Sequence, residues 1–367
     1  MLFDERPKER LRDFYDREEE LKLLHELVES CKPLILVLGL RRTGKTSLVK
    51  VALNEANIPY ILIDCRVFEE RIAITSRDFI RAFERSLNSL TKKRNKIVNY
   101  LRVVKGVSIA GLRVEFRWNS KERVSLIEVL ETLNQYGEDD GRCVVIALDE
   151  AQELSKLRGI NVLSILGYAY DNLKRISFIL TGSKVGLLYR FMRVDDPTSP
   201  IYGRVRYEVF LKNFSKEKSL DFLKRGFEQA GMKVENEVLE EAVDRLGGVV
   251  GWLTYFGALS LRYGASSETI ERTLEEGSKL ALQELKNFLR LRPIAEARYK
   301  LILKRIAQEE CSWRDIKSYI EMKLGIISDS NLALLLKQLL DVGFIEKRGR
   351  IYSITDPILR YAVNRYL

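Results

Sequence analysis

The sequence predicts an α/β domain with a doubly wound parallel sheet, followed by an all-helical segment and a small domain of three helices and a hairpin. Short, continuous apolar runs alternate with helical patterns in the first 211 residues. Such runs are typical of strands that are buried on both faces of a parallel sheet. Residues 215–291 show helical periodicity without further strand signals. A chain of 367 residues is long enough for two or three domains.

The elements of the predicted sheet domain can be placed in order along the chain. The spacing of Asp16 and Glu19 predicts a capping box at the start of a first helix, whose apolar residues recur at helical spacing. The apolar run 33–39 then predicts a strand that leads into a glycine-rich turn. Further strands are predicted at residues 59–64, 143–149, 176–181 and 205–211, and further helices at residues 45–54, 75–90 and 126–136.

The C-terminal part of the chain has a different pattern. Pro293 ends the all-helical segment, and three predicted helices follow at residues 295–309, 313–324 and 329–342. Two short strands around Arg348-Gly349-Arg350 complete the pattern, and three helices followed by a basic hairpin predict a winged helix. The predicted domains are an α/β core over residues 1–214, a helical domain over 215–291 and a winged-helix domain over 292–367.

Composition excludes several classes of protein. No apolar run approaches the roughly 18 residues of a transmembrane helix, and the first ten residues lack the apolar stretch of a signal peptide, so we expect no membrane contact. The single histidine, His25, argues against a histidine-based metal site or catalytic triad. The four cysteines are far apart and form no CxxC pair, so we expect neither structural zinc nor a disulfide scaffold, and a location in the reducing cytoplasm. They are Cys31, Cys65, Cys143 and Cys311.

The clearest functional motif is Gly39-Leu-Arg-Arg-Thr-Gly-Lys-Thr46, which matches the phosphate-loop pattern G-x-x-x-x-G-K-[ST] at every fixed position. An apolar strand precedes it and a helix follows, as the motif requires. Backbone N–H groups of such a loop bind the β-phosphate of a nucleotide. We expect Lys45 to contact the β- and γ-phosphates and Thr46 to bind Mg²⁺. The residues predicted to bind nucleotide here are Gly39, Arg42, Thr43, Gly44, Lys45, Thr46 and Ser47.

A second motif, Val144-Val-Ile-Ala-Leu-Asp-Glu150, is an apolar strand that ends in two carboxylates. Asp149 is predicted to support the metal, and Glu150 to position or deprotonate the attacking water, which distinguishes hydrolysis from binding alone. The strand at 176–181 leads into Thr181-Gly-Ser183, where either hydroxyl can sense a γ-phosphate or simply cap a helix. No Asn-Lys-x-Asp guanine-binding motif is present, so ATP is expected rather than GTP.

Together these motifs resemble the archaeal-type ATPase family, a branch of the STAND class of P-loop ATPases related to origin-recognition AAA+ proteins. The combination of Asp149-Glu-Ala-Gln152 with Gly247-Gly-Val-Val-Gly-Trp-Leu253 is narrower than the phosphate loop alone, which many families share. The stretches that carry the resemblance are 14–21, 39–46, 148–152, 181–183, 202–204 and 247–253, so it spans most of residues 14–260.

The resemblance implies a nucleotide-switched ATPase with a helical lid and a C-terminal winged helix. It implies that Phe14 and Arg17 border the adenine and that Gly248 belongs to a lid turn that closes over the nucleotide. The family usually has a proline where this chain has Val250, and the alternative for this turn is a helix C-cap. Arg204 is a candidate to reach a γ-phosphate, in the same chain or from a neighbour; the alternative is a surface arginine.

Positive charge suggests polyanionic partners. The chain has 62 Lys and Arg against 52 Asp and Glu, a net charge of +10. Residues 92–123 contain ten basic and two acidic residues and read as a basic hairpin inserted before the helix at 126. This insertion either contacts nucleic acid or an acidic protein, or is a solvated insertion without a partner.

The winged helix gives an ambiguous signal for DNA. A helix that reads the major groove normally presents several Arg, Lys, Asn or Gln side chains. The predicted recognition helix at 329–342 offers a thin set, and the hairpin is better suited to phosphates. Its polar candidates are Ser330, Asn331, Lys337 and Gln338, and the hairpin cations are Lys347, Arg348 and Arg350.

The sequence therefore predicts a Mg²⁺-dependent ATPase that binds ATP and ADP, hydrolyses ATP slowly and switches the position of its lid and winged helix. Glu150, Lys45 and Arg204 are the predicted catalytic residues, and Thr46 and Asp149 the metal ligands. Two alternatives stay open. One is a DNA-binding initiator or regulator that uses ATP only as a ligand, and the other is a signalling scaffold that oligomerises on ATP. The expected macromolecular partner is double-stranded DNA or an acidic protein.

Overall fold

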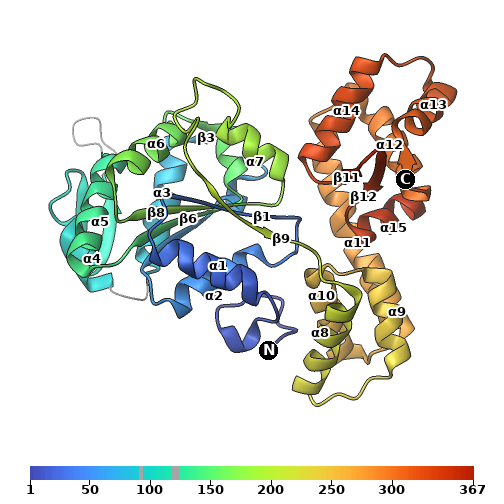
Figure 1. Ribbon diagram of the computed structural model, residues 1–367, viewed down its shortest axis with the longest axis horizontal. Helices are drawn as coiled ribbons and strands as arrows, with labels where there is room; N and C mark the ends of the chain where they lie inside the picture. Colours follow the sequence, from blue (N-terminus) through green and yellow to red (C-terminus); the bar gives the residue numbers. More distant parts are fainter. Residues whose placement is uncertain (91–93, 118–123) are drawn as a thin grey trace. The chain divides into compact units, whose positions relative to one another are not determined.

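The computed structural model describes residues 1–90, 94–117 and 124–367. The chain forms two compact units (Figure 1). The sheet unit comprises Lys8–Gly39 and Lys45–Leu211. The helical unit comprises Met1–Pro7, Leu40–Gly44 and Lys212–Leu367. In the described part of the chain, no helix is both long enough and apolar enough to span a membrane.

The sheet unit is built on five parallel strands in the order β2-β6-β8-β1-β9. This confirms the predicted parallel sheet and places β8 between the strand that precedes the phosphate loop and the strand that ends in Asp149. The last predicted strand starts two residues later than expected. The bounds are β1 (Leu34–Gly39), β2 (Tyr60–Asp64), β6 (Val144–Asp149), β8 (Ile176–Gly182) and β9 (Tyr207–Leu211).

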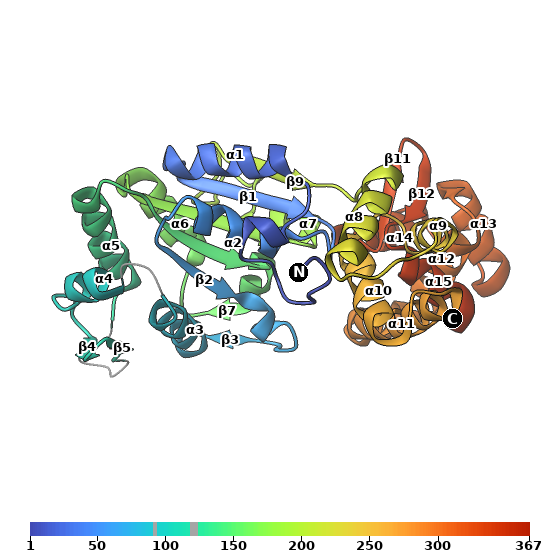
Figure 2. The same cartoon turned by 90° about the horizontal axis from the view of Figure 1, so that it is seen from below.

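Helices cover both faces of this sheet, and Figure 2 shows α1 and α3 on opposite sides of it. Side chains of α1 and α2 share a core with alternate residues of the strands, such as Ile35 and Val37. The other residues of the same strand, such as Leu36, belong to the core under α3, α5, α6 and α7. The bounds are α1 (Glu18–Glu29), α2 (Lys45–Glu55), α3 (Ser76–Asn88), α5 (Leu126–Asp140), α6 (Val162–Asn172) and α7 (Val185–Met192). The predicted capping box at the start of α1 is wrong, because the N-cap is Arg17 and no side-chain cap hydrogen bond is formed there.

The basic insertion forms a hairpin, as predicted, and the hairpin is anchored on α3. Asn88 of α3 donates to the carbonyl of Val114 (2.7 Å) and accepts from its N–H (2.9 Å). Val114 is fully buried, and the N–H of Phe116 donates to Glu84 (2.9 Å). Lys92, Lys93, Lys121 and Arg123 lie outside the described residues. The elements here are α4 (Arg94–Leu101), β4 (Val107–Ala110) and β5 (Arg113–Phe116), and a two-stranded sheet elsewhere pairs β3 (Ile74–Thr75) with β7 (Leu157–Arg158).

A disulfide joins Cys31 and Cys143, whose Cα atoms are 5.5 Å apart, so their distance in sequence, which argued against a disulfide scaffold, does not keep them apart. The two cysteines are 112 positions apart in sequence, but Cys143 directly precedes β6 and Cys31 lies three residues before β1, so both are near the start of a strand of the parallel sheet. Strands that run in parallel all start at one edge of the sheet, and this brings the cysteines together. Cys65 and Cys311 are buried free thiols. Cysteine spacing along the chain therefore gives no argument for a reducing compartment.

The helical unit begins with four lid helices, of which α11 is 24 residues long and also packs against the last helix of the chain, α15. Phe3 explains why the first residues belong to this unit. Its ring packs against Phe222 and Phe227, and only glycine fits beside it, because a Cβ at Gly226 or Gly257 would lie within 2.2 or 2.3 Å of the ring. The lid helices are α8 (Lys216–Gln229), α9 (Asn236–Leu246), α10 (Val250–Tyr263) and α11 (Ser267–Arg290).

The winged helix has the three predicted helices and the predicted hairpin, each within one or two residues of the expected bounds. A short strand before the second helix and a fourth helix at the end were not predicted. The hairpin and the short strand form a three-stranded sheet in the order β10-β12-β11. The elements are α12 (Glu296–Gln308), β10 (Cys311–Ser312), α13 (Trp313–Leu324), α14 (Asp329–Asp341), β11 (Ile345–Arg348), β12 (Ile351–Ile354) and α15 (Pro357–Tyr366).

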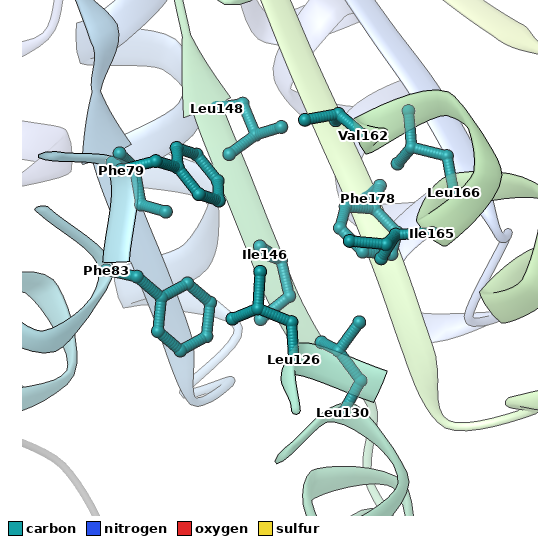
Figure 3. A pocket seen from close by; sticks show the side chains of 11 residues that line it. Phe79, Phe83, Leu126, Leu130, Ile146, Leu148, Val162, Ile165, Leu166 and Phe178 are labelled. Atoms are coloured by element: carbon teal, nitrogen blue, oxygen red, sulfur yellow. The ribbon is translucent and has the colours of Figure 1, made fainter. Parts of the chain in front are cut away.

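An apolar cavity of about 30 Å³ lies between the sheet and the helices α3, α5 and α6 (Figure 3). Figure 3 shows Phe79, Leu130, Ile146 and Phe178 among the side chains around it. The described residues that line it are all apolar, so it offers no partner to a water molecule. Imperfect packing at this point leaves the core sensitive to any further loss of volume.

Replacing Ile146 by valine should lower the free energy of unfolding by about 1 kcal/mol, because it removes a buried methyl group and enlarges a space that is already empty. Ile146 is 1% exposed. Ile72→Val is the matched control, since Ile72 is 92% exposed and the same change there should have almost no effect. Guanidinium-induced unfolding followed by circular dichroism measures both. Equal effects at the two positions would contradict the packing described here.

Candidate nucleotide-binding and hydrolysis site

Lys45 is a buried ammonium group at the start of α2. It is 5% exposed, and its Nζ donates to the carbonyl of Gly39 at 2.9 Å. Burying a charge is costly unless it is hydrogen-bonded or paired. A bound anion would therefore stabilise the buried ammonium group of Lys45. The helix α2 directs its N-terminal N–H groups to the same region, which favours phosphate.

Asp149, the last residue of β6, accepts hydrogen bonds from the end of the phosphate loop and from β8. One of its oxygens, Oδ2, accepts a hydrogen bond from the Thr46 hydroxyl at 2.8 Å, and Oδ1 accepts one from the Thr181 hydroxyl. Burial raises the pKa of Asp149, although the hydrogen bonds of Thr181 and Thr46 oppose the shift. A carboxylate and a hydroxyl side by side are the hard oxygen ligands that Mg²⁺ prefers. Thr46 and Asp149 therefore fit the predicted metal site.

Glu150 follows directly and is held by three hydrogen bonds to one oxygen, Oε2. The donors are the Ser183 N–H (3.1 Å), the Ser183 hydroxyl (2.6 Å) and the Gln152 amide (2.6 Å). Burial raises the pKa of Glu150, but the charge of Lys45 and the hydrogen bonds outweigh it, and the net pKa is lowered. The carboxylate is therefore ionised at neutral pH, as a general base must be.

Ser183 thus lies beside Glu150 and orients it, a role that the sequence did not suggest for this residue. Thr181 has a similar position, because its hydroxyl also accepts the N–H of Glu150 at 3.0 Å. Glu150 has left-handed backbone geometry (φ 53°), which is uncommon for a residue with a side chain. Its conformation is supported by these two hydroxyl residues from the end of β8. Contact of Ser183 with a γ-phosphate stays a prediction.

Asp64 and Arg66 lie beside Asp149 and were not predicted as site residues. Asp64 ends β2 and is the register partner of Asp149 on the neighbouring strand. Arg66 donates to Asp64 through Nε (2.8 Å) and Nη2 (2.6 Å), and its Nη2 is 3.8 Å from Oδ2 of Asp149. Burial raises the pKa of Asp64, but the hydrogen bonds and charge of Arg66 outweigh it and lower the net pKa.

A group of ion pairs links the chain segments that follow β2, β6 and β8. Glu153, which is 5% exposed, accepts from Lys156 at 2.6 Å and from Lys184 at 3.2 Å. Lys184 also pairs with Glu69 at 2.9 Å. Lys184 directly follows Ser183, and Glu153 follows Gln152, so these pairs hold the two segments that orient Glu150.

Arg42, in the middle of the phosphate loop, contacts lid and winged-helix residues of the helical unit. Its guanidinium lies 4.1 Å from the centre of the Trp252 ring, and its Nη2 is 2.9 Å from Glu284 Oε1. Trp252 in turn donates to Asp356 of the winged helix at 2.9 Å. The carbonyl of Arg42 accepts from the N–H of Gly251 at 2.9 Å. We call Arg42, Trp252, Glu284 and Asp356 the arginine cluster.

The remaining loop residues have local roles. The Thr43 hydroxyl donates to the carbonyl of Leu40 at 2.9 Å, and the Ser47 hydroxyl accepts from the N–H of Lys8 at 3.0 Å. Gly44 has φ +95°, a conformation that residues with side chains rarely adopt. The predicted contacts of Arg42, Thr43, Gly44 and Ser47 with nucleotide stay predictions.

The glycine pair that the resemblance placed against the nucleotide has a packing role in the lid. Gly247 ends α9 with φ 66°, which agrees with the helix C-cap alternative. Gly248 touches the backbone of Phe214, because a Cβ there would lie 1.9 Å from the Phe214 carbonyl oxygen. A contact of Gly248 with nucleotide stays a prediction.

Three other predicted site residues have contacts in the structure that do not include Asp149 or Glu150. Arg204 pairs with Asp171 of α6 through Nε (3.1 Å) and Nη2 (2.5 Å) and also donates to the carbonyl of Pro200. Its contacts therefore support the surface-arginine alternative within one chain. Arg17 is 6% exposed and pairs with Glu20 at 3.0 Å. Phe14 packs, partly buried, on the core that α1 and α2 share with the sheet.

Comparison with known proteins concerns the family and the fold. Residues 14–256 match a family described as an ATPase domain predominantly from Archaea. Residues 293–354 match the C-terminal winged helix-turn-helix domain of MCM proteins. The Walker-type ATPase PABY2304 of Pyrococcus abyssi is similar in structure, with 38% identity, 99% of each chain covered and a TM-score of 0.86. No curated protein matches the chain.

A more distant similarity concerns the fold alone. The ORC2 protein of Aeropyrum pernix, solved as ADPNP-ADP complexes, is 15% identical, with 99% of this chain and 96% of that chain covered and a TM-score of 0.61. The same protein in its ADP form gives a TM-score of 0.55 at 16% identity, with the same coverage. The parallel-sheet ATPase fold with a C-terminal winged helix, as predicted from the sequence, is thus confirmed.

Proposed function

Because the chain belongs to the family of ATPase domains found predominantly in Archaea, we propose that it binds ATP with Mg²⁺, hydrolyses it slowly and uses the nucleotide as a conformational switch. Bound Mg²⁺ would offset phosphate charge between Thr46 and Asp149. Lys45 would hold the phosphates, and Glu150 would accept a proton from the attacking water. The lowered pKa of Glu150 and its three hydrogen bonds support this role.

The arginine cluster is the observation that supports the proposed conformational switch. Residues 40–44 belong to the helical unit, although both ends of the phosphate loop belong to the sheet unit. A phosphate group that settles on the loop must fit the backbone conformation of residues 40–44. That conformation is coupled to the lid through the hydrogen bond between Arg42 and Gly251, and to the winged helix through Trp252 and Asp356. Nucleotide in the loop should therefore change the surroundings of Trp252.

Trp252 fluorescence tests this proposal directly. The chain has three tryptophans, so replacing Trp118 and Trp313 by phenylalanine leaves Trp252 as the single emitter. We expect its emission to change when ADP or a non-hydrolysable ATP analogue binds, and to change differently for the two nucleotides. Calorimetric titration of the same variant measures binding independently of the fluorescence.

Trp252→Phe, which keeps the other two tryptophans, is the control and should show a much smaller nucleotide response. Phosphate release from ATP, with and without Mg²⁺, tests hydrolysis. Binding without any change in Trp252 emission would contradict the switch but not the nucleotide site. Absence of both binding and turnover would overturn the proposed function as a whole.

The winged helix favours contact with DNA phosphates as a second candidate function, and it does so through the hairpin rather than through α14. Gln338 of α14 is occupied, because Arg292 donates to it at 2.8 Å and Tyr299 at 2.6 Å. The exposed face of α14 carries an apolar side chain, Leu334, which is 53% exposed. The hairpin, in contrast, exposes Lys347 and Arg350 at its tip. Such cations can neutralise phosphates without reading bases.

Replacing Lys347 and Arg350 by alanine should weaken duplex DNA binding and flatten its salt dependence by about 0.9 in log-log slope for each phosphate that the variant no longer neutralises. Fluorescence anisotropy with mixed-sequence duplex at several salt concentrations measures this. The control removes two cations of α12, Lys300 and Lys304, and keeps the same net charge as the hairpin variant. If the wild type shows no duplex binding at low salt, a protein partner replaces DNA in this proposal.

Association on ATP is the remaining alternative, and it concerns Arg204. Among the described residues of one chain, Arg204 donates hydrogen bonds to Asp171 and to the carbonyl of Pro200, and none of these bonds reaches Asp149 or Glu150. A role for Arg204 in hydrolysis therefore needs a second copy of the chain. Light scattering with an ATP analogue decides this, because a catalytic Arg204 requires that the molar mass increase with nucleotide.

A further inference from the structure

The Asp64–Arg66 pair provides a fixed guanidinium group next to the predicted metal site. Asp64 binds Arg66 three times, through the backbone N–H (3.0 Å), Nε (2.8 Å) and Nη2 (2.6 Å). Asp64 also caps the short helix η2 (Cys65–Phe68), so both partners are fixed at the end of β2. A guanidinium held in this way loses little conformational freedom when it binds a ligand.

The guanidinium of Arg66 has N–H groups that its bonds to Asp64 do not use. Arg66 is 51% exposed, and among the described residues its Nη1 has no hydrogen-bond partner. Its Nη2 is 3.8 Å from Oδ2 of Asp149, which is too long for a hydrogen bond but close enough for attraction between charges. The same Oδ2 accepts the Thr46 hydroxyl. Arg66 therefore lies near one of the two oxygens predicted to hold the metal, and that oxygen is hydrogen-bonded to the other.

We propose that Arg66 contacts the terminal phosphate of a bound nucleoside triphosphate and makes the site prefer triphosphate over diphosphate. This inference rests on the proposed nucleotide site. Lys45 and the loop N–H groups supply the contacts that a diphosphate shares with a triphosphate. Arg66 lies instead in η2, directly after β2, the strand that pairs with the strand of Asp149, and its planar fork matches phosphate oxygens. Asp64 is then the positioning residue that directs the fork.

A purely structural role predicts a different result. If Arg66 only offset the charges of Asp64 and Asp149, its removal would affect stability, or the affinity for both nucleotides to the same extent. A contact with the terminal phosphate changes the triphosphate affinity and leaves the diphosphate affinity nearly constant. The ratio of the two affinities therefore separates these roles, and no turnover needs to be measured.

The test compares Arg66→Ala with the wild type by calorimetric titration of ADP and of a non-hydrolysable ATP analogue, both with Mg²⁺. We expect the affinity for the analogue to fall about tenfold or more and the affinity for ADP to change less than about twofold. Arg66→Lys should lose most of the preference, because an ammonium keeps the charge but not the fork. Asp64→Asn should lose part of it.

Arg71→Ala is the matched control. Arg71 is 48% exposed and pairs with Asp78 at 2.8 Å, so it resembles Arg66 in exposure and pairing but not in position. Parallel decreases in affinity for both nucleotides, or an unchanged ratio in Arg66→Ala, would overturn the assignment of Arg66. If the assignment of Arg66 fails but Arg66→Ala still binds ADP and its Trp252 emission still changes, the proposed function holds. Absence of all nucleotide binding in the wild type would overturn both.

Discussion

Replacing Lys45 by alanine should lower the affinity for both ATP and ADP by roughly tenfold to a hundredfold, the usual value of a hydrogen bond between charged groups. Lys45 is almost fully buried, and a buried ammonium that donates to a loop carbonyl is poised to exchange that partner for phosphate. Because the lysine is expected to contact the β-phosphate, which ATP and ADP share, both affinities should fall. This distinguishes Lys45 from Arg66. Titration of a fluorescent ADP and a fluorescent ATP analogue measures the change.

The same variant should raise the pKa of Glu150. The charge of Lys45 is the main influence that opposes burial at this carboxyl group. Lys50→Ala is the control, because Lys50 belongs to the same helix but forms an exposed ion pair with Glu9 at 2.8 Å. Its nucleotide affinity should equal that of the wild type. Wild-type affinity in Lys45→Ala would show that the loop does not bind phosphate.

The elements that the sequence predicted are those whose signal is local. The strand-loop-helix around Gly39–Thr46 combines an apolar run, a fixed glycine spacing and a helix start within a few residues. The winged helix was found from helix lengths and a hairpin with a glycine at its turn. The helices α6 and α7 were not predicted. In α6, apolar and aromatic residues occupy several sides, which weakens the 3.6-residue pattern, and α7 is only eight residues long.

The features that the sequence missed depend on which strands are neighbours. Asp64 and Asp149 lie 85 residues apart, and only the order β2-β6 makes them register partners. The disulfide has the same origin, because it joins residues that precede two strands of one sheet. A polar Asp64-Cys-Arg66 directly after an apolar strand was a usable signal. Parallel strands end at one edge, where ligands bind.

Long-range side-chain contacts explain the other differences. Arg42 fits the motif as a variable loop position, and nothing near it in sequence indicates that Trp252 and Asp356 surround it. Arg204 was singled out in the stretch 202–204 that carries the resemblance, and its partner Asp171 comes from a helix that was not predicted. Ser183 was correctly placed at the carboxyl edge of the sheet, but its actual partner, Glu150, emerged only from the structure.

Replacing Glu150 by glutamine should abolish most ATP hydrolysis, by roughly 10²-fold to 10⁴-fold, and leave nucleotide binding intact. Glutamine has nearly the same shape and keeps an oxygen for the Ser183 N–H and hydroxyl, but it cannot accept a proton from water. Phosphate release in single-turnover conditions measures hydrolysis, and titration with the ATP analogue measures binding. Trp252 emission should still respond to ATP, because the switch depends on occupancy of the loop.

Glu138→Gln is the matched control, because Glu138 also accepts from an amide side chain, that of Asn134 at 3.0 Å, but it belongs to α5. Its turnover should equal that of the wild type. The turnover of Ser183→Ala should lie between those of Glu150→Gln and Glu138→Gln, since this change removes one of the three donors that orient Glu150 without removing the base. If Glu150→Gln hydrolyses ATP at the wild-type rate, the water is activated elsewhere, and the three hydrogen bonds on Oε2 serve the conformation of the segment after β6 instead of catalysis.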